Sequence, residues 1–212
     1  MWRNIFIIIF LSHTCYSQVN EVPYCLDLTL GYHSEEGNIT CLMNRQDSSK
    51  LCFNSKEQKA TGFDKNGSLK YSGYYSDKRR SCCIYKNGEW KIYYFNSKLY
   101  AIGKYKDNLP YGKWTYFYEN GLIMKVENYR IIDTQGESKS ILCKSFREYF
   151  ESGTLKTKGF YKVEEGKDSI AIPSSTPPYS DEYVTYKSRS SFKTGKWKNF
   201  DLNGKLIKIE EY

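Results

Sequence analysis

The stretch "YGKWTYFYENGLIMKVENY", residues 111–129, decides the fold because it reads as two short aromatic strands around a Glu119-Asn120-Gly121 corner. Tyrosine, tryptophan and phenylalanine favour strands over helices. Asn-Gly tolerates positive φ at both central turn positions, as a two-residue type I′ hairpin turn requires. The stretch therefore predicts a β-hairpin that begins near Trp114 and ends near Tyr129.

The same hairpin recurs along the chain. If Trp114 is position 0, an aromatic residue at +3, an aliphatic residue at +9 and a tyrosine at +15 recur in five copies. The copies begin at Ala60, Trp90, Trp114, Phe146 and Trp197, and four of them keep a glycine at +7. A single hairpin cannot bury its own face, so neighbouring copies must stack. We therefore predict an all-β fold, an elongated antiparallel meander of successive β-hairpins that is mostly single-layered.

The predicted turn also assigns side chains to faces. A two-residue turn pairs +4 with +9, +3 with +10 and position 0 with +13. Strand alternation then places 0, +4, +9 and +15 on one face, which is expected to be the core, and +3 on the other. Gly103 and Gly159 at +13 would face Trp90 and Phe146, so that a ring can cover bare backbone. Glu127 and Glu210 break this pattern in the third and fifth copies.

The first 17 residues have the layout of a secretory signal peptide. A positively charged start is followed by an apolar run over residues 5–11 and by small residues before the expected cleavage site between Ser17 and Gln18. The run is too short to span a bilayer, so no transmembrane segment is expected after cleavage. Lipidation at Cys15 is the alternative. The expected location is extracytoplasmic, that is periplasmic, outer-surface or secreted.

The rest of the chain divides into a cap and a repeat region. Residues 18–59 are predicted to form an N-terminal, cysteine-containing cap. Residues 60–212 carry the five copies, with insertions expected at 130–145 and 162–193. Because the second insertion contains the run Pro173-Ser174-Ser175-Thr176-Pro177-Pro178, we expect a loop there.

Cleavage changes two counts. It removes Arg3 and Cys15, which lowers the formal charge from +8 to +7 and leaves six cysteines. An even number of cysteines in an exported chain predicts disulfides, although 15 connectivities remain open. If Cys82 and Cys83 lie on a strand, they point to opposite faces and need different partners. The disulfide candidates are Cys25, Cys41, Cys52, Cys82, Cys83 and Cys143. A zinc site is not expected, since no Cys-x-x-Cys pair exists and the mature chain has only His33.

The segments "GKWTYFYENG", "GEWKIYYFNS" and "GKWKNFDLNG" resemble the bacterial variant of the MORN repeat, which occurs in exported bacterial proteins and in the YwqK-type antitoxin family. A Gly-x-Trp lead-in stands at residues 88–90, 112–114 and 195–197 and is absent from the first and fourth copies. The resemblance covers roughly residues 60–129, 146–161 and 194–212. It implies successive β-hairpins in an elongated, single-layered sheet, and it implies no reaction.

Catalytic groups do not converge in the sequence. A nucleophile would have to use His33, and its neighbours match no nucleophile motif. Glu119 and Glu151 share one repeat position and could act as paired carboxylates, but that position is a solvent-facing strand end. No phosphate-binding loop or metal-ligand spacing occurs. We therefore expect no enzymatic activity, cofactor or metal.

The candidate binding surface is the row of aromatic residues at +3. Equivalent residues of successive copies lie two strands apart, about 9.5 Å, which leaves slots between the rings. Such a ladder could hold a peptide, a glycan or a lipid. The alternative is that the cap or the insertions cover the row as a second core. The row consists of Phe63, Tyr93, Phe117, Tyr149 and Phe200.

The basic surplus, densest at Lys78-Arg79-Arg80, suits an anionic partner. Export argues against nucleic acid, so the expected partners are a protein, an envelope glycan or an anionic lipid surface. The alternative is that the lysines only keep an open sheet soluble. The sequence thus predicts an exported, non-enzymatic binding or scaffolding module at the cell envelope. An antitoxin- or immunity-like protein that binds a cognate partner protein is the alternative.

Overall fold

The computed structural model describes residues 24–25, 30–44, 48–77, 83–134, 137–173 and 181–212. The predicted signal peptide, Cys15, Cys82, the basic cluster Lys78-Arg79-Arg80 and most of the proline-rich run lie outside these ranges.

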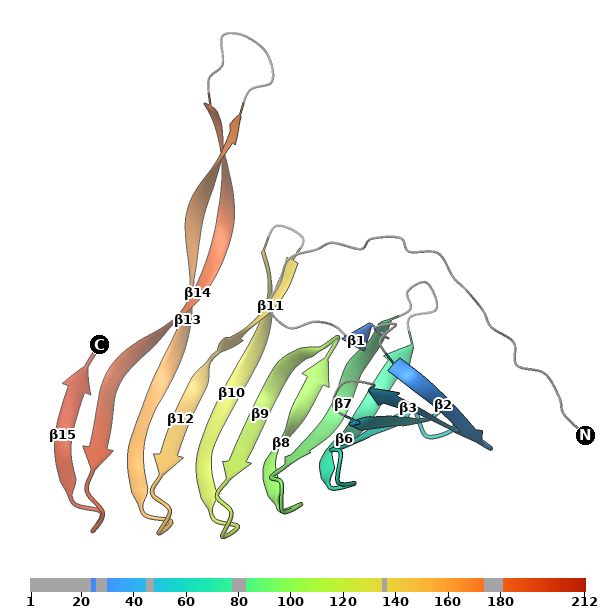
Figure 1. The fold of residues 1–212 in the computed structure, drawn as a ribbon. Coiled ribbons are helices and arrows are strands. Elements are labelled where there is room, and N and C mark those ends of the chain that lie inside the picture. Colours follow the sequence, from blue (N-terminus) through green and yellow to red (C-terminus); the bar gives the residue numbers. More distant parts are fainter. Residues whose placement is uncertain (1–23, 26–29, 45–47, 78–82, 135–136, 174–180) are drawn as a thin grey trace, which may run out of the picture.

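The described residues form one open antiparallel sheet and no helix, which confirms the all-β prediction. Thirteen strands follow one another in the order β15-β14-β13-β12-β10-β9-β8-β7-β6-β5-β4-β3-β2, while β1 pairs with β7 and β11 with β10. The sheet curls along its length (Figure 1). The strands are β1 Tyr24–Cys25, β2 Leu30–Glu36, β3 Ile39–Asn44, β4 Lys50–Asn54, β5 Lys59–Phe63, β6 Leu69–Asp77, β7 Cys83–Tyr93, β8 Leu99–Lys106, β9 Leu109–Phe117, β10 Ile123–Thr134, β11 Glu137–Leu142, β12 Lys144–Tyr149, β13 Leu155–Pro173, β14 Asp181–Phe200 and β15 Leu206–Glu211.

The five copies are five successive hairpins of this sheet, β5–β6, β7–β8, β9–β10, β12–β13 and β14–β15. Strands β2, β3 and β4 of the predicted cap continue the sheet beyond β5. In the second insertion, β13 and β14 extend into a long hairpin that rises above the sheet (Figure 1). Within the described residues, no helix is long and apolar enough to cross a membrane.

The predicted type I′ turn is wrong. In the opening hairpin the Gly121 N–H donates to the Tyr118 carbonyl at 2.9 Å, and the Tyr118 N–H donates to the Leu122 carbonyl at 2.8 Å. Only Gly121 has a positive φ, 86°, and Asn120 has none. These features define a type I turn followed by one residue in the left-handed region. Asn120 contributes through its side chain instead, because its Oδ1 accepts the Leu122 N–H at 2.9 Å.

The longer turn changes which residues pair. Position +3 faces +9, as Phe117 faces Ile123, and a register shift after +9 restores the expected pairing of position 0 with +13. The pairing of 0 with +13 is therefore confirmed, as for Trp90 and Gly103. The assignment of +9 to the core face is wrong: Ile123 is 39% exposed and shares the face of the +3 residues.

The core lies on one face of the sheet, which we call the tryptophan face. Trp90, Trp114 and Trp197 are buried there. Each ring lies on the +13 glycine of the preceding copy, so Trp114 covers Gly103, and a Cβ added to that glycine would overlap the ring. The ring that covers Gly103 is thus not that of its strand partner Trp90, as the sequence suggested, but that of the next copy.

Two of these tryptophans are also anchored by hydrogen bonds to the preceding copy, whereas the buried Trp197 Nε1 has no hydrogen-bond partner among the described residues. The Trp90 Nε1–H donates to the Tyr74 carbonyl at 2.7 Å, and the Trp114 Nε1–H donates to the Lys104 carbonyl at 3.1 Å. Both acceptors stand at +14 of the preceding copy. Trp90 and Trp114 therefore each join one hairpin to the next through the ring and through the N–H.

The Gly-x-Trp lead-in reflects a backbone requirement. The residue two places before position 0 has a positive φ in all five copies, and the values are 51° for Gln58, 70° for Gly88, 69° for Gly112, 60° for Lys144 and 65° for Gly195. Glycine adopts this conformation freely, whereas residues with a Cβ do not. Gln58 and Lys144 mark the two copies that lack the lead-in glycine.

We therefore expect Lys144→Gly to raise the free energy of unfolding by about 1 kcal/mol, because it removes the steric cost of a left-handed lysine. Urea unfolding followed by tryptophan fluorescence measures this change. Lys113→Gly is the control: Lys113 is an exposed strand lysine without a positive φ, so its replacement should destabilise by roughly 0.5–1 kcal/mol. Equal destabilisation by both substitutions would show that the positive φ of Lys144 carries no steric cost.

The cysteines divide by strand pairing. Cys41 and Cys52 face each other on β3 and β4 and form a disulfide. The backbone register also places Cys25 opposite Cys83. Cys143 is a buried free thiol, whose pKa is raised by burial. Cys143, one of the disulfide candidates, is therefore unpaired in the described part of the chain.

Candidate functional site

The five predicted binding residues lie on the face opposite the tryptophans. Each pairs across its hairpin with the aliphatic residue at +9. All five are half-buried, and every described strand belongs to the same sheet, so no second layer of described strands lies over them. We call this set the outer row: Phe63, Tyr93, Phe117, Tyr149 and Phe200.

Three cations form a line beside the C-terminal end of the outer row. Arg147 on β12 faces Lys158 on β13, which in turn faces Lys198 on β14. Strand alternation places Arg147 on the face of Tyr149 and Lys198 on the face of Phe200. We call these three residues the basic row.

The basic row is open to solvent and lacks acidic partners. Arg147 and Lys158 are exposed, and the Lys158 Nζ lies 5.8 Å from the centre of the Phe200 ring. Among the described residues, no ion pair involves any of the three. Like charges directly opposite each other on paired strands are destabilising. The row therefore combines aromatic contact surface with positive charge that the described part of the chain does not neutralise.

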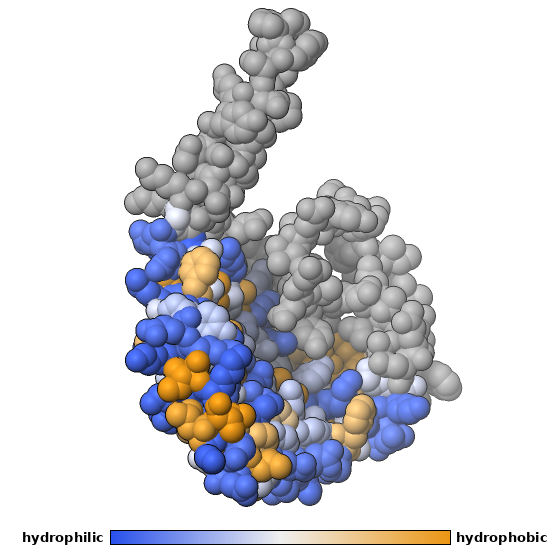
Figure 2. Space-filling model, turned by 90° about the vertical axis from the view of Figure 1, so that its left-hand side faces the viewer, coloured by the Kyte–Doolittle hydropathy of each residue, from blue (hydrophilic) through white to orange (hydrophobic). Residues whose placement is uncertain are grey.

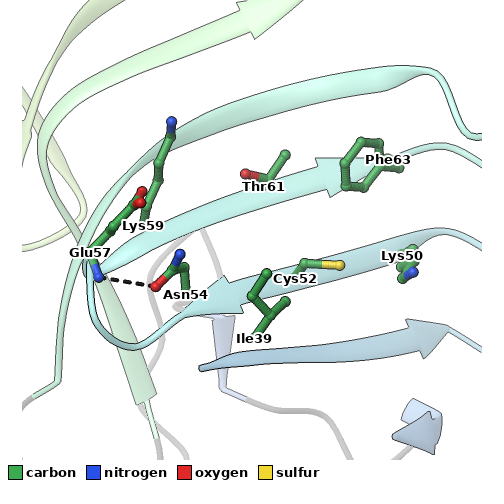
Figure 3. Close-up of a pocket in the computed structure, with 8 residues that line it drawn as sticks. All are labelled: Ile39, Lys50, Cys52, Asn54, Glu57, Lys59, Thr61 and Phe63. Atoms are coloured by element: carbon green, nitrogen blue, oxygen red, sulfur yellow. Dashed lines mark hydrogen bonds between the residues drawn. The ribbon is translucent and has the colours of Figure 1, made fainter. Parts of the chain in front are cut away.

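The N-terminal end of the outer row borders a pocket of about 370 Å³ (Figure 3). Phe63 lines it together with Ile39, Lys50 and Cys52, the cysteine bonded to Cys41. Strands β3, β4 and β5 supply these side chains. This pocket places Phe63 beside the side chains of β3 and β4, which come from the predicted cap.

A buried polar cluster lies on the tryptophan face of the third copy. Glu127 is only 6% exposed, and it accepts hydrogen bonds from Lys125 Nζ and from the Tyr129 hydroxyl, both at 2.9 Å. Burial, and then the contact with Glu127, raises the pKa of Tyr129 to about 12. Burial also raises the pKa of Tyr116, whose ring centre lies 4.3 Å from Lys125 Nζ.

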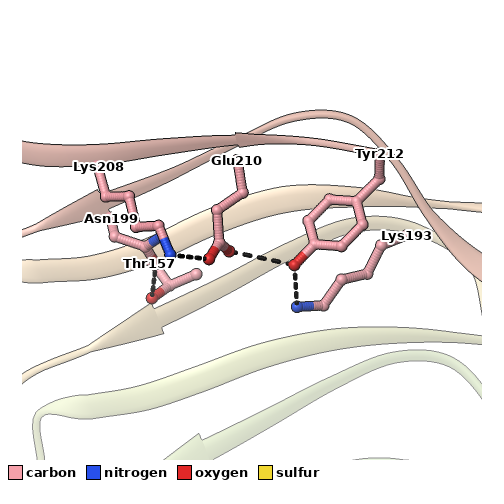
Figure 4. A network of polar contacts seen from close by, with 6 residues as sticks. All are labelled: Thr157, Lys193, Asn199, Lys208, Glu210 and Tyr212. Atoms are coloured by element: carbon pink, nitrogen blue, oxygen red, sulfur yellow. Dashed lines mark hydrogen bonds and ion pairs between the residues drawn. The ribbon is translucent and has the colours of Figure 1, made fainter.

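The fifth copy repeats this cluster at the end of the sheet. Lys208 Nζ donates to Glu210 at 2.6 Å and the Tyr212 hydroxyl donates to Glu210 at 3.1 Å (Figure 4). The contact with Lys208, followed by that with Tyr212, lowers the pKa of Glu210. The third copy buries the carboxylate of this Lys-Glu-Tyr arrangement, whereas in the fifth copy Glu210 is half-buried and Lys208 and Tyr212 are exposed.

The end of the sheet at β15 carries exposed apolar side chains. Leu202 is 65% exposed and Ile207 is 64% exposed. In Figure 2, which views the molecule from this end, apolar side chains lie among hydrophilic ones.

The catalytic alternatives find no support in the described part of the chain. Glu119 and Glu151 are exposed turn residues, and Glu119 accepts a hydrogen bond from Asn96 Nδ2 at 2.9 Å. His33 lies on β2. No group of three or more metal-ligating side chains occurs among the described residues.

Sequence reasoning missed the basic row. Arg147 and Lys198 share the offset +1, which was a usable signal, but Lys158 stands at +12 of the same copy as Arg147. Their alignment depends on the register across β12, β13 and β14, and the second insertion hides that register in the sequence.

Comparison with protein families supports the repeat assignment. Residues 86–107, 110–130, 142–162 and 193–212 match the model of the MORN repeat variant. A search of curated proteins found no match to the chain. The matched segments coincide with the second to fifth copies, so these four hairpins are similar to the MORN repeat variant, a type of repeat that typically mediates binding or scaffolding.

Proposed function

We propose that this protein is an exported, non-enzymatic binding module at the cell envelope, and that its outer row and basic row hold an anionic partner. The observation that carries the proposal is the line formed by Arg147, Lys158 and Lys198. Neighbouring strands are about 4.8 Å apart, so the three charges repel one another in the free protein. A bound anion relieves this repulsion, which makes binding more favourable than attraction to isolated cations would be.

The aromatic neighbours add contact surface to this charge. Tyr149 and Phe200 flank the basic row on the same face and are half-buried, so a partner can pack against the rings while its acidic groups reach the cations. The signal peptide predicted over residues 1–17 supports an envelope partner: an acidic glycan, an anionic lipid surface or an acidic protein.

Binding of the mature chain, expected to be residues 18–212, to vesicles with and without anionic lipid and to an acidic polysaccharide tests the proposal. The triple substitution Arg147→Glu, Lys158→Glu and Lys198→Glu should weaken binding at least tenfold. The control triple Lys56→Glu, Lys65→Glu and Lys205→Glu carries the same charge change on exposed turn residues and should weaken binding much less. An equal loss in both triples would show that only net charge matters, and the proposal would fail.

The second candidate is a protein partner, as expected for an antitoxin- or immunity-like protein of the YwqK type. Crosslinking in the native host followed by mass spectrometry separates the two. One dominant stoichiometric protein, lost in the basic-row triple, favours the cognate-protein role. Recovery of envelope material without such a protein favours the first role.

A further inference from the structure

A pocket of about 300 Å³ opens between the first and second copies. Its lining is mainly apolar and includes Ile92, Tyr94 and Tyr100, and Asp64 stands at one side. Ile92, Tyr94 and Tyr100 share the tryptophan face, so this pocket is separate from the basic row, although Tyr93 of the outer row is among the residues that line it.

The equivalent places at the next two junctions are filled by tyrosines of the chain itself. Tyr94, at +4 of the second copy, donates its hydroxyl to the Phe117 carbonyl at 2.7 Å. Tyr118, at +4 of the third copy, donates its hydroxyl to the Tyr149 carbonyl at 2.7 Å. In both cases the ring crosses the junction and the hydroxyl reaches the carbonyl at +3 of the following copy.

The first copy lacks this tyrosine. Position +4 is Asp64, whose side chain turns back and accepts the Asn66 and Ser68 N–H groups, both at 2.8 Å. Asp64 therefore caps its own turn and does not cross to the second copy. The pocket lies where the ring would be, next to Tyr93, whose carbonyl is the equivalent of the acceptors at Phe117 and Tyr149.

We infer that this pocket binds a tyrosine side chain of a partner protein, with the ring against Ile92 and the hydroxyl donating to the Tyr93 carbonyl. The inference deepens the proposed function by naming a side chain that the partner contributes. The Asp64 carboxylate and the Tyr93 carbonyl accept hydrogen bonds, so a neutral hydroxyl donor fits beside them better than an acidic group. Lys70 also lines the pocket and can lie over the ring, as Lys125 lies over Tyr116.

Two small probes test the inference directly. N-acetyl-tyrosinamide should shift the NMR methyl signals of Ile92 and Leu69, both of which line the pocket. N-acetyl-phenylalaninamide, which lacks the hydroxyl, should bind about tenfold more weakly, the effect of one hydrogen bond of about 1.4 kcal/mol. Equal affinity for the two probes, or no shift with either at millimolar concentration, overturns the inference.

The chain offers a matched pair of variants. Asp64→Tyr should place a ring of the chain itself in the pocket and abolish the response to the tyrosine probe. Asp201→Tyr makes the same change at +4 of the fifth copy, where Asp201 also caps its turn and which is the last described hairpin, and it should leave the response intact. Asp64→Asn keeps both the cap and the pocket, so it should still bind. Asp64→Ala removes the cap without placing a ring in the pocket, so retained binding in that variant shows that loss of the cap is not the cause. Retained binding in Asp64→Tyr contradicts the inference.

The same proteins separate this inference from the proposed function. Asp64→Tyr should bind anionic vesicles like the wild type, because the basic row lies on the other face. The basic-row triple should bind the tyrosine probe like the wild type. If binding at one of the two sites is not observed, binding at the other can therefore still be measured.

Discussion

Replacing Trp114 by alanine should lower the free energy of unfolding by roughly 3–5 kcal/mol, the range for removal of a large buried aromatic side chain. Trp114 is 2% exposed, and its ring centre lies 5.0 Å from that of Tyr105 in an edge-to-face arrangement. The substitution also removes the hydrogen bond to the Lys104 carbonyl and uncovers Gly103. Urea unfolding followed by far-ultraviolet circular dichroism measures the loss.

A double-mutant cycle with Gly103→Ala tests whether the contact between Trp114 and Gly103 accounts for part of this loss of stability. Alone, Gly103→Ala should cost about 1–3 kcal/mol, because the new methyl group overlaps the Trp114 ring and the backbone must move. When Gly103→Ala is combined with Trp114→Ala, the new methyl group enters the space that the ring has vacated, so the additional cost of Gly103→Ala should vanish. Additive losses in the double variant would show that the two residues do not share this contact.

Glu127→Ala should lower the free energy of unfolding by about 3–5 kcal/mol, because it leaves Lys125 and Tyr129 without their buried acceptor. Glu210→Ala is the matched control, since it removes the same two kinds of contact at the exposed end of the sheet and should change stability little. Thermal unfolding of the two variants at pH 7 makes the comparison. Similar losses would show that burial does not set the strength of this cluster.

Alkaline titration gives an independent measurement of the Glu127 cluster. The folded-state pKa of Tyr129, about 12, is higher than its ordinary value of 10.0, so the fold favours the neutral phenol. This contribution to stability is complete below pH 10 and is lost as the pH rises from 10 through 12. Glu127→Ala removes one cause of the shift, so tyrosinate absorbance from Tyr129 should appear at a lower pH.

The sequence predicted the repeat unit but not the details of its turn. Asn-Gly suits a type I′ turn, with both residues at positive φ, and also a type I turn followed by a left-handed glycine, and the sequence does not distinguish them. The longer turn moved Ile123 to the opposite face, because a shift of one residue reverses every side chain. The extra residue at Met124 then restored the register, so the pairing of position 0 with +13 was correct despite the wrong turn.

The candidate sites were predictable only in part. The aromatic periodicity places the outer row on one face, because its residues share one offset. The basic row depends on pairing across the second insertion, and the pocket at Asp64 depends on a side chain that turns back instead of crossing to the next hairpin. Neither property is encoded in the spacing of residues within one copy.

The contact between a tryptophan and the glycine of the preceding copy has a consequence for the order of the hairpins. Gly73, Gly103 and Gly159 are each followed by a copy that starts with tryptophan. Glu127 is followed by a copy that starts with Phe146. The copies are therefore not interchangeable modules: a shuffled, duplicated or shortened chain should fold only if each glycine keeps its tryptophan, and a sixth hairpin added after Glu210 should begin with phenylalanine.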